Sequence, residues 1–112
     1  MISYEGVGEV VITLGMEEAA QPGMVVCMAD SGWARPCEDG ELFCGVVNKK
    51  NQQYTGGVQL KGCVSVTYSG EMELGHVRLV ANGEGGVRMD ENGVDVVVLD
   101  APYEGNVAVI YL

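Results

Sequence analysis

The stretch Val58 to Tyr68, V-Q-L-K-G-C-V-S-V-T-Y, alternates apolar and mostly polar residues. A period of two is typical of a β-strand with one buried face, and the β-branched and aromatic residue types favour the same structure. A strand of this length would span roughly 35 Å, which is long for a small domain. Gly62 lies at its middle, so we expect a bulge or bend there that lets the strand turn a barrel corner.

Two segments on either side of this strand, residues 23–47 and 75–99, resemble each other. The matched positions include Gly23 with Gly75, Val25 with Val77, and Ala29 with Ala81. Both segments carry Asp-Gly or Asn-Gly pairs, which favour hairpin turns. Either an ancestral duplication or the small repertoire of β-hairpins accounts for the match. We therefore predict an all-β, compact β-barrel or β-clip-like domain with two similar hairpin units around a long central strand.

The chain of 112 residues has the length of one domain. Residues 1–9 predict an N-terminal arm and residues 10–112 a single β domain, with one possible helical turn at residues 16–21. The polar residues 48–57 predict a loop. Residues 94–99 and 107–112 are nearly continuous apolar runs, so we expect strands buried on both faces, inside the fold or across a subunit interface.

Charge and composition exclude several classes of protein. The formal net charge is −10, which disfavours nucleic-acid binding because that binding needs Lys and Arg at phosphates. The charge makes the chain soluble, or it forms an acidic surface for a basic partner. No apolar run is long enough for a membrane span, and the first residues do not have the pattern of a signal peptide. We expect neither nucleic acid nor membrane among its partners.

The four cysteines, Cys27, Cys37, Cys44 and Cys63, show no C-x-x-C spacing. This pattern predicts no metal site, and we expect free thiols that behave as small apolar groups, with an incidental disulfide as the alternative. The single histidine, His76, lies in no nucleophile motif, so we expect it to be structural or on the surface. We predict no catalytic residues, no cofactor and no enzymatic activity.

Five residues are candidates for interactions: Tyr4, Trp33, Lys49, Lys50 and Tyr54. The two lysines and Tyr54 form a locally basic place on an acidic chain, although an exposed hairpin loop explains them as well. Trp33 follows a turn and is by default a core or interface anchor, with a ligand platform as the alternative.

The chain resembles small β proteins of tailed bacteriophages and prophages that decorate the head or associate with the capsid, including the DUF2190 family. The matching elements are Gly23-Met24-Val25-Val26, Gly45-Val46-Val47, Leu60-Lys61-Gly62-Cys63-Val64, Gly75-His76-Val77-Arg78-Leu79 and Val107 to Leu112. The resemblance implies a β-barrel or β-clip-like fold. It also implies a homo-oligomer, with a trimer as the expected state, placed on the major capsid protein with its arm against the shell.

Two functional hypotheses follow. The first is a non-enzymatic structural protein that decorates or stabilises a phage head, located in the virion if the chain is phage-derived and otherwise in the bacterial cytoplasm. The second is a small ligand- or sugar-binding β module with a pocket near Trp33, Tyr54 or Tyr68.

Overall fold

The computed structural model describes residues 9–102 and 105–112, with the exception of the side chain of residue 52. These residues form ten β-strands and no helix, so the all-β prediction is confirmed, and no described segment is a helix that could cross a membrane. The strands are β1 (Val10–Met16), β2 (Val25–Asp30), β3 (Trp33–Pro36), β4 (Gly45–Gln52), β5 (Thr55–Lys61), β6 (Cys63–Thr67), β7 (Gly75–Ala81), β8 (Val87–Met89), β9 (Val94–Asp100) and β10 (Val107–Tyr111). The predicted arm and Tyr4 lie outside the described residues, except for Glu9.

The first unit, β1 to β5, is a closed barrel with the strand order β1-β3-β2-β4-β5. Only the β1–β3 pairing is parallel, and it is short, because it joins Gly15 to Trp33 and Met16 to Ala34. The other pairings are antiparallel. The barrel interior is filled by small and medium apolar side chains: Met16, Ala20, Val26, Ala34, Val47 and Val58.

The second unit, β6 to β10, repeats this arrangement strand by strand. Its order is β6-β10-β9-β7-β8, with every strand pairing antiparallel. A parallel bridge between Tyr68 and Val87 joins the end of β6 to the start of β8, where the first unit has its parallel β1–β3 pairing. The shared strand order includes this parallel contact, which hairpins alone do not produce. The two similar units predicted from sequence therefore share one strand order.

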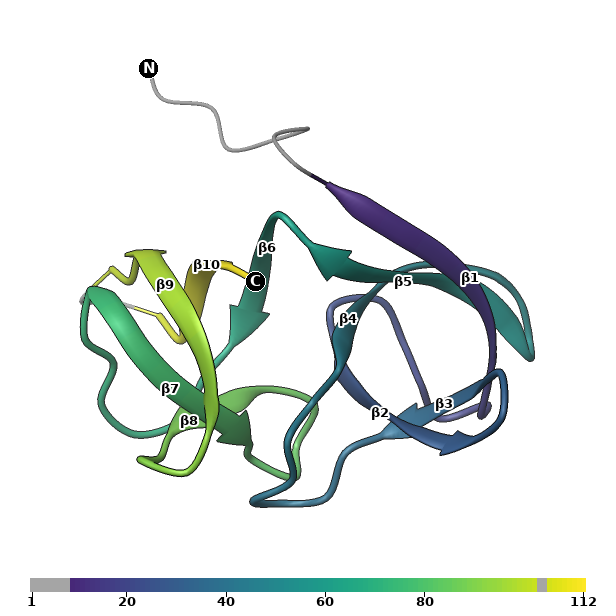
Figure 1. Ribbon diagram of the computed structural model, residues 1–112, viewed down its shortest axis with the longest axis horizontal. Coiled ribbons are helices and arrows are strands. Elements are labelled where there is room, and N and C mark those ends of the chain that lie inside the picture. Colours follow the sequence, from purple (N-terminus) through teal and green to yellow (C-terminus); the bar gives the residue numbers. More distant parts are fainter. Residues whose placement is uncertain (1–8, 103–104) are drawn as a thin grey trace.

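The connection between the units is a sharp bend at Gly62, which separates β5 from β6. Gly62 has φ +103°, a conformation that favours glycine, and a Cβ there would lie 3.0 Å from the Cα of Glu9. The predicted bend is confirmed. The stretch Val58 to Tyr68 nevertheless contributes to two sheets. Its first half belongs to β5 of the barrel, and its second half forms β6, the first strand of the second unit (Figure 1).

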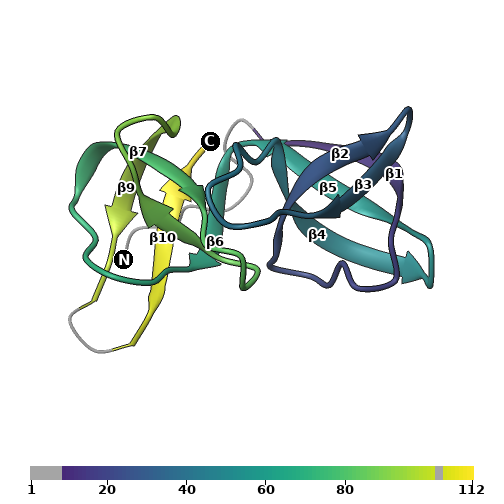
Figure 2. The same cartoon turned by 90° about the horizontal axis from the view of Figure 1, so that it is seen from below.

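The two units lie side by side along the long axis of the molecule (Figures 1 and 2). One apolar cluster joins them. The barrel contributes Val25, Cys27, Cys37, Phe43 and Val46, and the second unit contributes Val66, Leu79, Ala81, Val87, Val96, Val98, Ala108 and Ile110. The outer wall of the barrel on this side is therefore part of the core.

Two predictions about segments are wrong. Residues 48–57 are not a loop, because β4 and β5 form a hairpin with its turn at Gln53–Tyr54. A hairpin whose outer face is exposed needs few apolar residues, so its polarity resembled that of a loop. The helical turn at residues 16–21 is absent, since Met16 ends β1 and a turn follows, closed by a bond from the Ala20 N–H to the Glu17 carbonyl.

The two late apolar runs are buried on one face of the sheet, and not on both faces within this chain. In β9 and β10 the buried residues alternate with more exposed ones. The buried members are Val96, Val98, Ala108 and Ile110, and the exposed members include Leu99, Val107 and Tyr111. The prediction of two-sided burial inside the fold is therefore wrong, and burial across a subunit interface stays a prediction.

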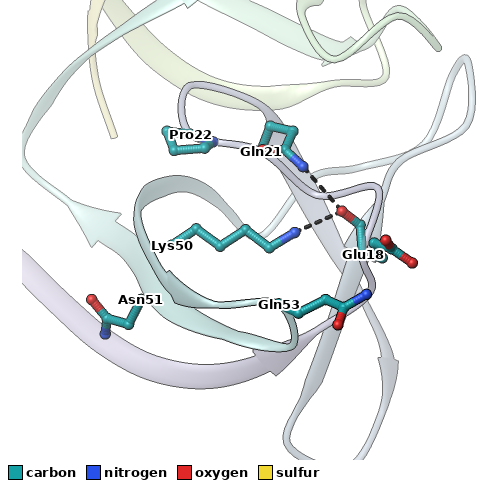
Figure 3. Close-up of a pocket in the computed structure, with 6 residues that line it drawn as sticks. All are labelled: Glu18, Gln21, Pro22, Lys50, Asn51 and Gln53. Carbon is teal, nitrogen blue, oxygen red and sulfur yellow. Dashed lines mark hydrogen bonds between the residues drawn. The ribbon is translucent and has the colours of Figure 1, made fainter.

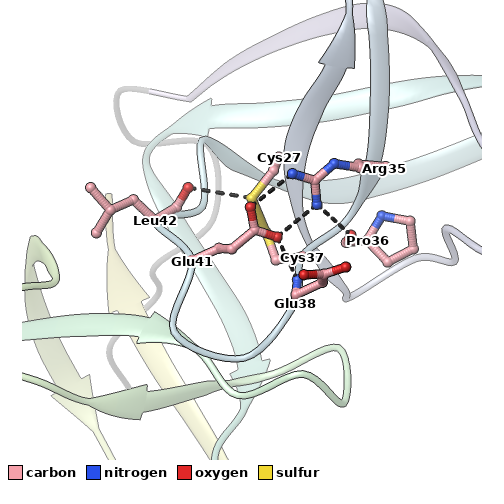
Figure 4. The surroundings of a disulfide bond; sticks show 7 residues. All are labelled: Cys27, Arg35, Pro36, Cys37, Glu38, Glu41 and Leu42. Atoms are coloured by element: carbon pink, nitrogen blue, oxygen red, sulfur yellow. Dashed lines mark hydrogen bonds and ion pairs between the residues drawn. A yellow bond between two sulfur atoms is a disulfide. The ribbon is translucent and has the colours of Figure 1, made fainter.

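A disulfide joins Cys27 on β2 to Cys37 after β3, with their Cα atoms 5.4 Å apart (Figure 4). The prediction of free thiols is wrong for this pair, because the β2–β3 register sets Cys27 opposite Arg35, two residues before Cys37. Cys44 and Cys63 are free thiols, as predicted. The disulfide is buried in the cluster that joins the two units and ties the loop after β3 to the barrel wall.

Candidate interaction surface

The end of β1 lies between two hairpin turns, and this position brings two predicted residues together. The N–H of Gly15 donates to the carbonyl of Gly32 at 2.9 Å, and the N–H of Met16 donates to the carbonyl of Tyr54 at 2.9 Å. Gly15 also pairs with Trp33 on one side and with Thr55 on the other. The β2–β3 and β4–β5 turns are therefore joined through β1.

The aromatic patch consists of Trp33 and Tyr54, whose ring centroids lie 6.4 Å apart at an interplanar angle of 61°. A Cβ on Gly15 would lie 3.0 Å from two indole ring atoms and 3.2 Å from a third. These similar distances place Gly15 beneath one face of the indole. Trp33 is 42 % exposed and Tyr54 is 49 % exposed. Trp33 is therefore not the core anchor that is the default for a tryptophan, and the patch is open to solvent.

Acidic side chains flank this patch. Asp30, which is exposed, pairs with Trp33 across the β2–β3 turn. Glu17 is also exposed; it follows the end of β1, and its N–H donates to the carbonyl of Ala34 on β3 at 3.1 Å. Asp30 Oδ1 accepts the N–H of Ser31 at 2.7 Å.

The nearest arginine is already paired. Arg35 follows Trp33 by two residues on β3, and its Nη1 and Nη2 donate to Glu41 Oε1 and Oε2 at 2.7 and 2.8 Å (Figure 4). The Glu38 N–H donates to the same carboxylate at 2.7 Å. The hydrogen bonds from Arg35, and then from the Glu38 N–H, lower the pKa of Glu41 to about 2. The pair holds the start of the loop after β3.

The two predicted lysines have different roles. Lys50 Nζ donates to the carbonyls of Glu18 and Ala20 at 2.6 and 2.8 Å, so it holds the turn after β1 in place. Lys49 is exposed on β4, opposite Gly57. The two lysines of the predicted basic site therefore differ, because Lys50 is structural and Lys49 is on the surface.

A shallow polar pocket of about 470 Å³ surrounds Lys50 (Figure 3). It is lined by Glu18, Gln21, Pro22, Lys50, Asn51 and Gln53. Gln21 Nε2 donates to the Glu18 carbonyl at 3.0 Å, beside the bond from Lys50. The polar groups that the pocket offers for a ligand are therefore mostly amides.

A second shallow pocket, of about 580 Å³, lies on the second unit and includes His76. His76 is exposed, as predicted for a surface histidine. Arg78 also lines this pocket. Its Nε donates to Asp95 Oδ1 and its Nη1 donates to the Glu91 carbonyl, each at 3.0 Å. In the described part of the chain, no three His, Cys, Asp or Glu side chains are grouped to hold a metal ion.

The exposed apolar strand is the first half of β1, residues 10–14. Val10, Val11 and Ile12 are 46 %, 42 % and 38 % exposed. Residues 10–14 pair with β5 on one side, and residues 9–102 and 105–112 provide no strand on their other side. No charged residue occurs between Val10 and Met16.

The chain matches no family model and no curated protein. Of the predicted interaction residues, the structure brings Trp33 and Tyr54 together, leaves Lys49 exposed on β4 and gives Lys50 a structural role. Sequence reasoning missed the exposed edge of β1 and the role of Gly15. The signal for the edge was an uncharged strand that is followed at once by Glu17 and Glu18.

Proposed function

We propose that this chain is a non-enzymatic structural protein that assembles as a homo-oligomer on a larger protein shell, in the manner of a phage head decoration protein. A trimer is the expected state, the major capsid protein is the expected larger partner, and the virion is the expected location. The resemblance in sequence supports the phage context, and the exposed apolar strand supports the assembly.

The single observation that carries the proposal is the open edge of β1. Native proteins protect such edges with charged residues, proline or a covering element, because unpaired N–H and C=O groups recruit another strand. Residues 10–14 have no charge and no proline. Three neighbouring apolar side chains on this strand are also exposed, as expected for a surface that another chain covers. A neighbouring copy can cover this edge with a different part of its own surface, and three such head-to-tail contacts close a ring, as the expected trimer requires.

The net negative charge of the chain is a further argument for association through the uncharged edge of β1. Two chains that each carry −10 repel one another over most of their surfaces. Association between copies is therefore least opposed where the surface carries no charge, and residues 10–16 are such a segment.

The test is the solution mass of a Val11→Lys variant. Val11 is exposed, and its side chain lies over Gly57 on the outer face. A lysine there is tolerated by the isolated chain and opposes a copy docked on β1, so the variant is expected to have a smaller mass by light scattering. Leu74→Lys is the control, because Leu74 is an exposed apolar residue just before β7, outside β1 and outside the apolar runs of β9 and β10. Equal masses for the wild type and both variants would contradict the role of β1.

A small ligand- or sugar-binding module is the second candidate function. The exposed rings of Trp33 and Tyr54 support it, because open aromatic faces stack on the apolar faces of sugars. The titration described in the next subsection separates this candidate from a protein partner.

A further inference from the structure

The aromatic patch presents two rings at an angle and carboxylates at its rim. One face of the indole of Trp33 is against Gly15, so the exposed part of the side chain is the opposite face and the rim. Tyr54 meets it at 61°, so the two rings form the walls of an open corner. A cation over the face of a tryptophan or tyrosine within about 6 Å of the centroid is attracted by the electrons of the ring.

From this geometry we propose that the aromatic patch binds an arginine side chain from a basic segment of a partner protein. The guanidinium stacks on the indole of Trp33, and its N–H groups donate to the carboxylate of Asp30, with Glu17 adding negative charge. Arginine fits better than lysine because its planar group both stacks on aromatic rings and donates two parallel hydrogen bonds. The inference rests on the proposed function for one point only, that the partner is a protein.

Two cations of the barrel are already engaged in other contacts. The guanidinium of Arg35 is held by both oxygens of Glu41, and the ammonium of Lys50 is held by two backbone carbonyls. Lys49 is exposed on β4, opposite Gly57. The net charge of −10 adds a long-range attraction for a basic segment.

The second unit shows that the repeated fold does not need an exposed tryptophan here. Trp33 is the first residue of β3 and pairs with β1, and the corresponding first residue of β8 is Val87, bridged to Tyr68. Val87 is fully buried in the cluster between the units. A small apolar residue is thus sufficient at this position of the strand order, and the exposed indole is a property of the first unit alone.

The experiment uses the fluorescence of Trp33, which is the only tryptophan in the chain. The full chain is titrated with a capped oligo-arginine peptide and with an oligo-citrulline peptide of the same length, which is isosteric and uncharged. We expect a saturable change in emission with the arginine peptide only, weakened by added salt because the site is exposed.

Two variants keep the reporter and change the site. Tyr54→Ala and Asp30→Asn are each expected to weaken binding of the arginine peptide by about three- to five-fold, the size expected for an exposed cation–π or ionic contact. Glu71→Gln is the control, because Glu71 is exposed on the second unit and its loss changes the net charge by the same amount as Asp30→Asn. Thermal melts of all variants check that they fold.

Three results would overturn the inference. The first is an equal effect of Asp30→Asn and Glu71→Gln, which means attraction to the overall charge. The second is an equal response to the citrulline peptide. The third is a response to a neutral malto-oligosaccharide without one to the arginine peptide, which identifies a sugar site. The titration is independent of the oligomer test, since Val11→Lys does not alter Trp33, Tyr54 or Asp30, so either proposal can fail alone.

Discussion

At the scale of single residues, Gly15 decides the geometry of the aromatic patch. A Cβ at this position would lie 3.0 Å from the indole of Trp33, which is closer than almost any real Cβ contact. We expect Gly15→Ala to displace the indole from β1 and from Tyr54. The loss of stability is expected to be small, about 1 kcal/mol or less, because the indole is exposed and can move.

Tryptophan emission checks this prediction, with a shift to longer wavelength expected for a more solvated ring. Thr13→Ala is the control, because Thr13 is an exposed residue two positions earlier on the same face of β1. An unchanged emission spectrum in Gly15→Ala would show that the indole does not lie on this glycine.

The carboxylate of Glu41 is expected to make the stability of the fold depend on pH in the acidic range. The hydrogen bonds from Arg35 and from the Glu38 N–H lower its pKa in the folded chain to about 2, below the ordinary value of 4.5. A lowered folded-state pKa gives stability that is present above the unfolded-state value and is lost as pH falls towards the folded-state value. The contribution of Glu41 is therefore expected to disappear between about pH 4.5 and pH 2.

Urea unfolding at a series of pH values measures this effect. Stability should fall less steeply between pH 5 and pH 2 in Glu41→Gln than in the wild type, because the variant no longer has this carboxylate to protonate. Glu71→Gln is the control, because it removes an exposed carboxylate that lies outside this ion pair. The same slope in the wild type and Glu41→Gln would mean that the Arg35–Glu41 pair does not persist in solution.

At the scale of elements, the Cys27–Cys37 disulfide joins β2 to the loop after β3. The bond closes a short loop, so its removal is expected to cost about 2–3 kcal/mol through the greater freedom of the unfolded chain. Reduction should lower the melting temperature of the wild type and leave that of a Cys27→Ala/Cys37→Ala double variant unchanged.

A thiol count on the denatured chain gives an independent check. Two reactive thiols, from Cys44 and Cys63, are expected before reduction and four after it. Four thiols before reduction would contradict the disulfide. The count also bears on location, because disulfides persist in oxidising surroundings such as virion surfaces and are rare in a reducing cytoplasm.

At the scale of the whole molecule, the sequence predicted the fold class because its signals are local. The alternation in Val58 to Tyr68 and the glycine at its middle gave both the strands and the bend. The similar spacing of residues 23–47 and 75–99 gave the two units. Each signal depends on residues close together in the sequence, so it can be recognised without the structure.

Apart from the two local segments, residues 16–21 and 48–57, the errors concern contacts and burial that depend on residues distant in the sequence. The parallel β1–β3 contact joins Gly15 to Trp33 and has no local signature, so the aromatic patch was foreseen as single residues and not as a pair. The disulfide depends on the β2–β3 register. The apolar runs near the C-terminus were predicted to be buried on both faces, because an exposed valine and a buried valine look alike in sequence.

For the whole molecule, we propose that another copy of the chain covers the edge of β1. The most direct test is the solution mass of the wild-type chain, measured by light scattering during size exclusion over a range of concentrations. We expect a multiple of the 11.9 kDa of one chain, with three as the expected number. A mass of one chain at every concentration would contradict it.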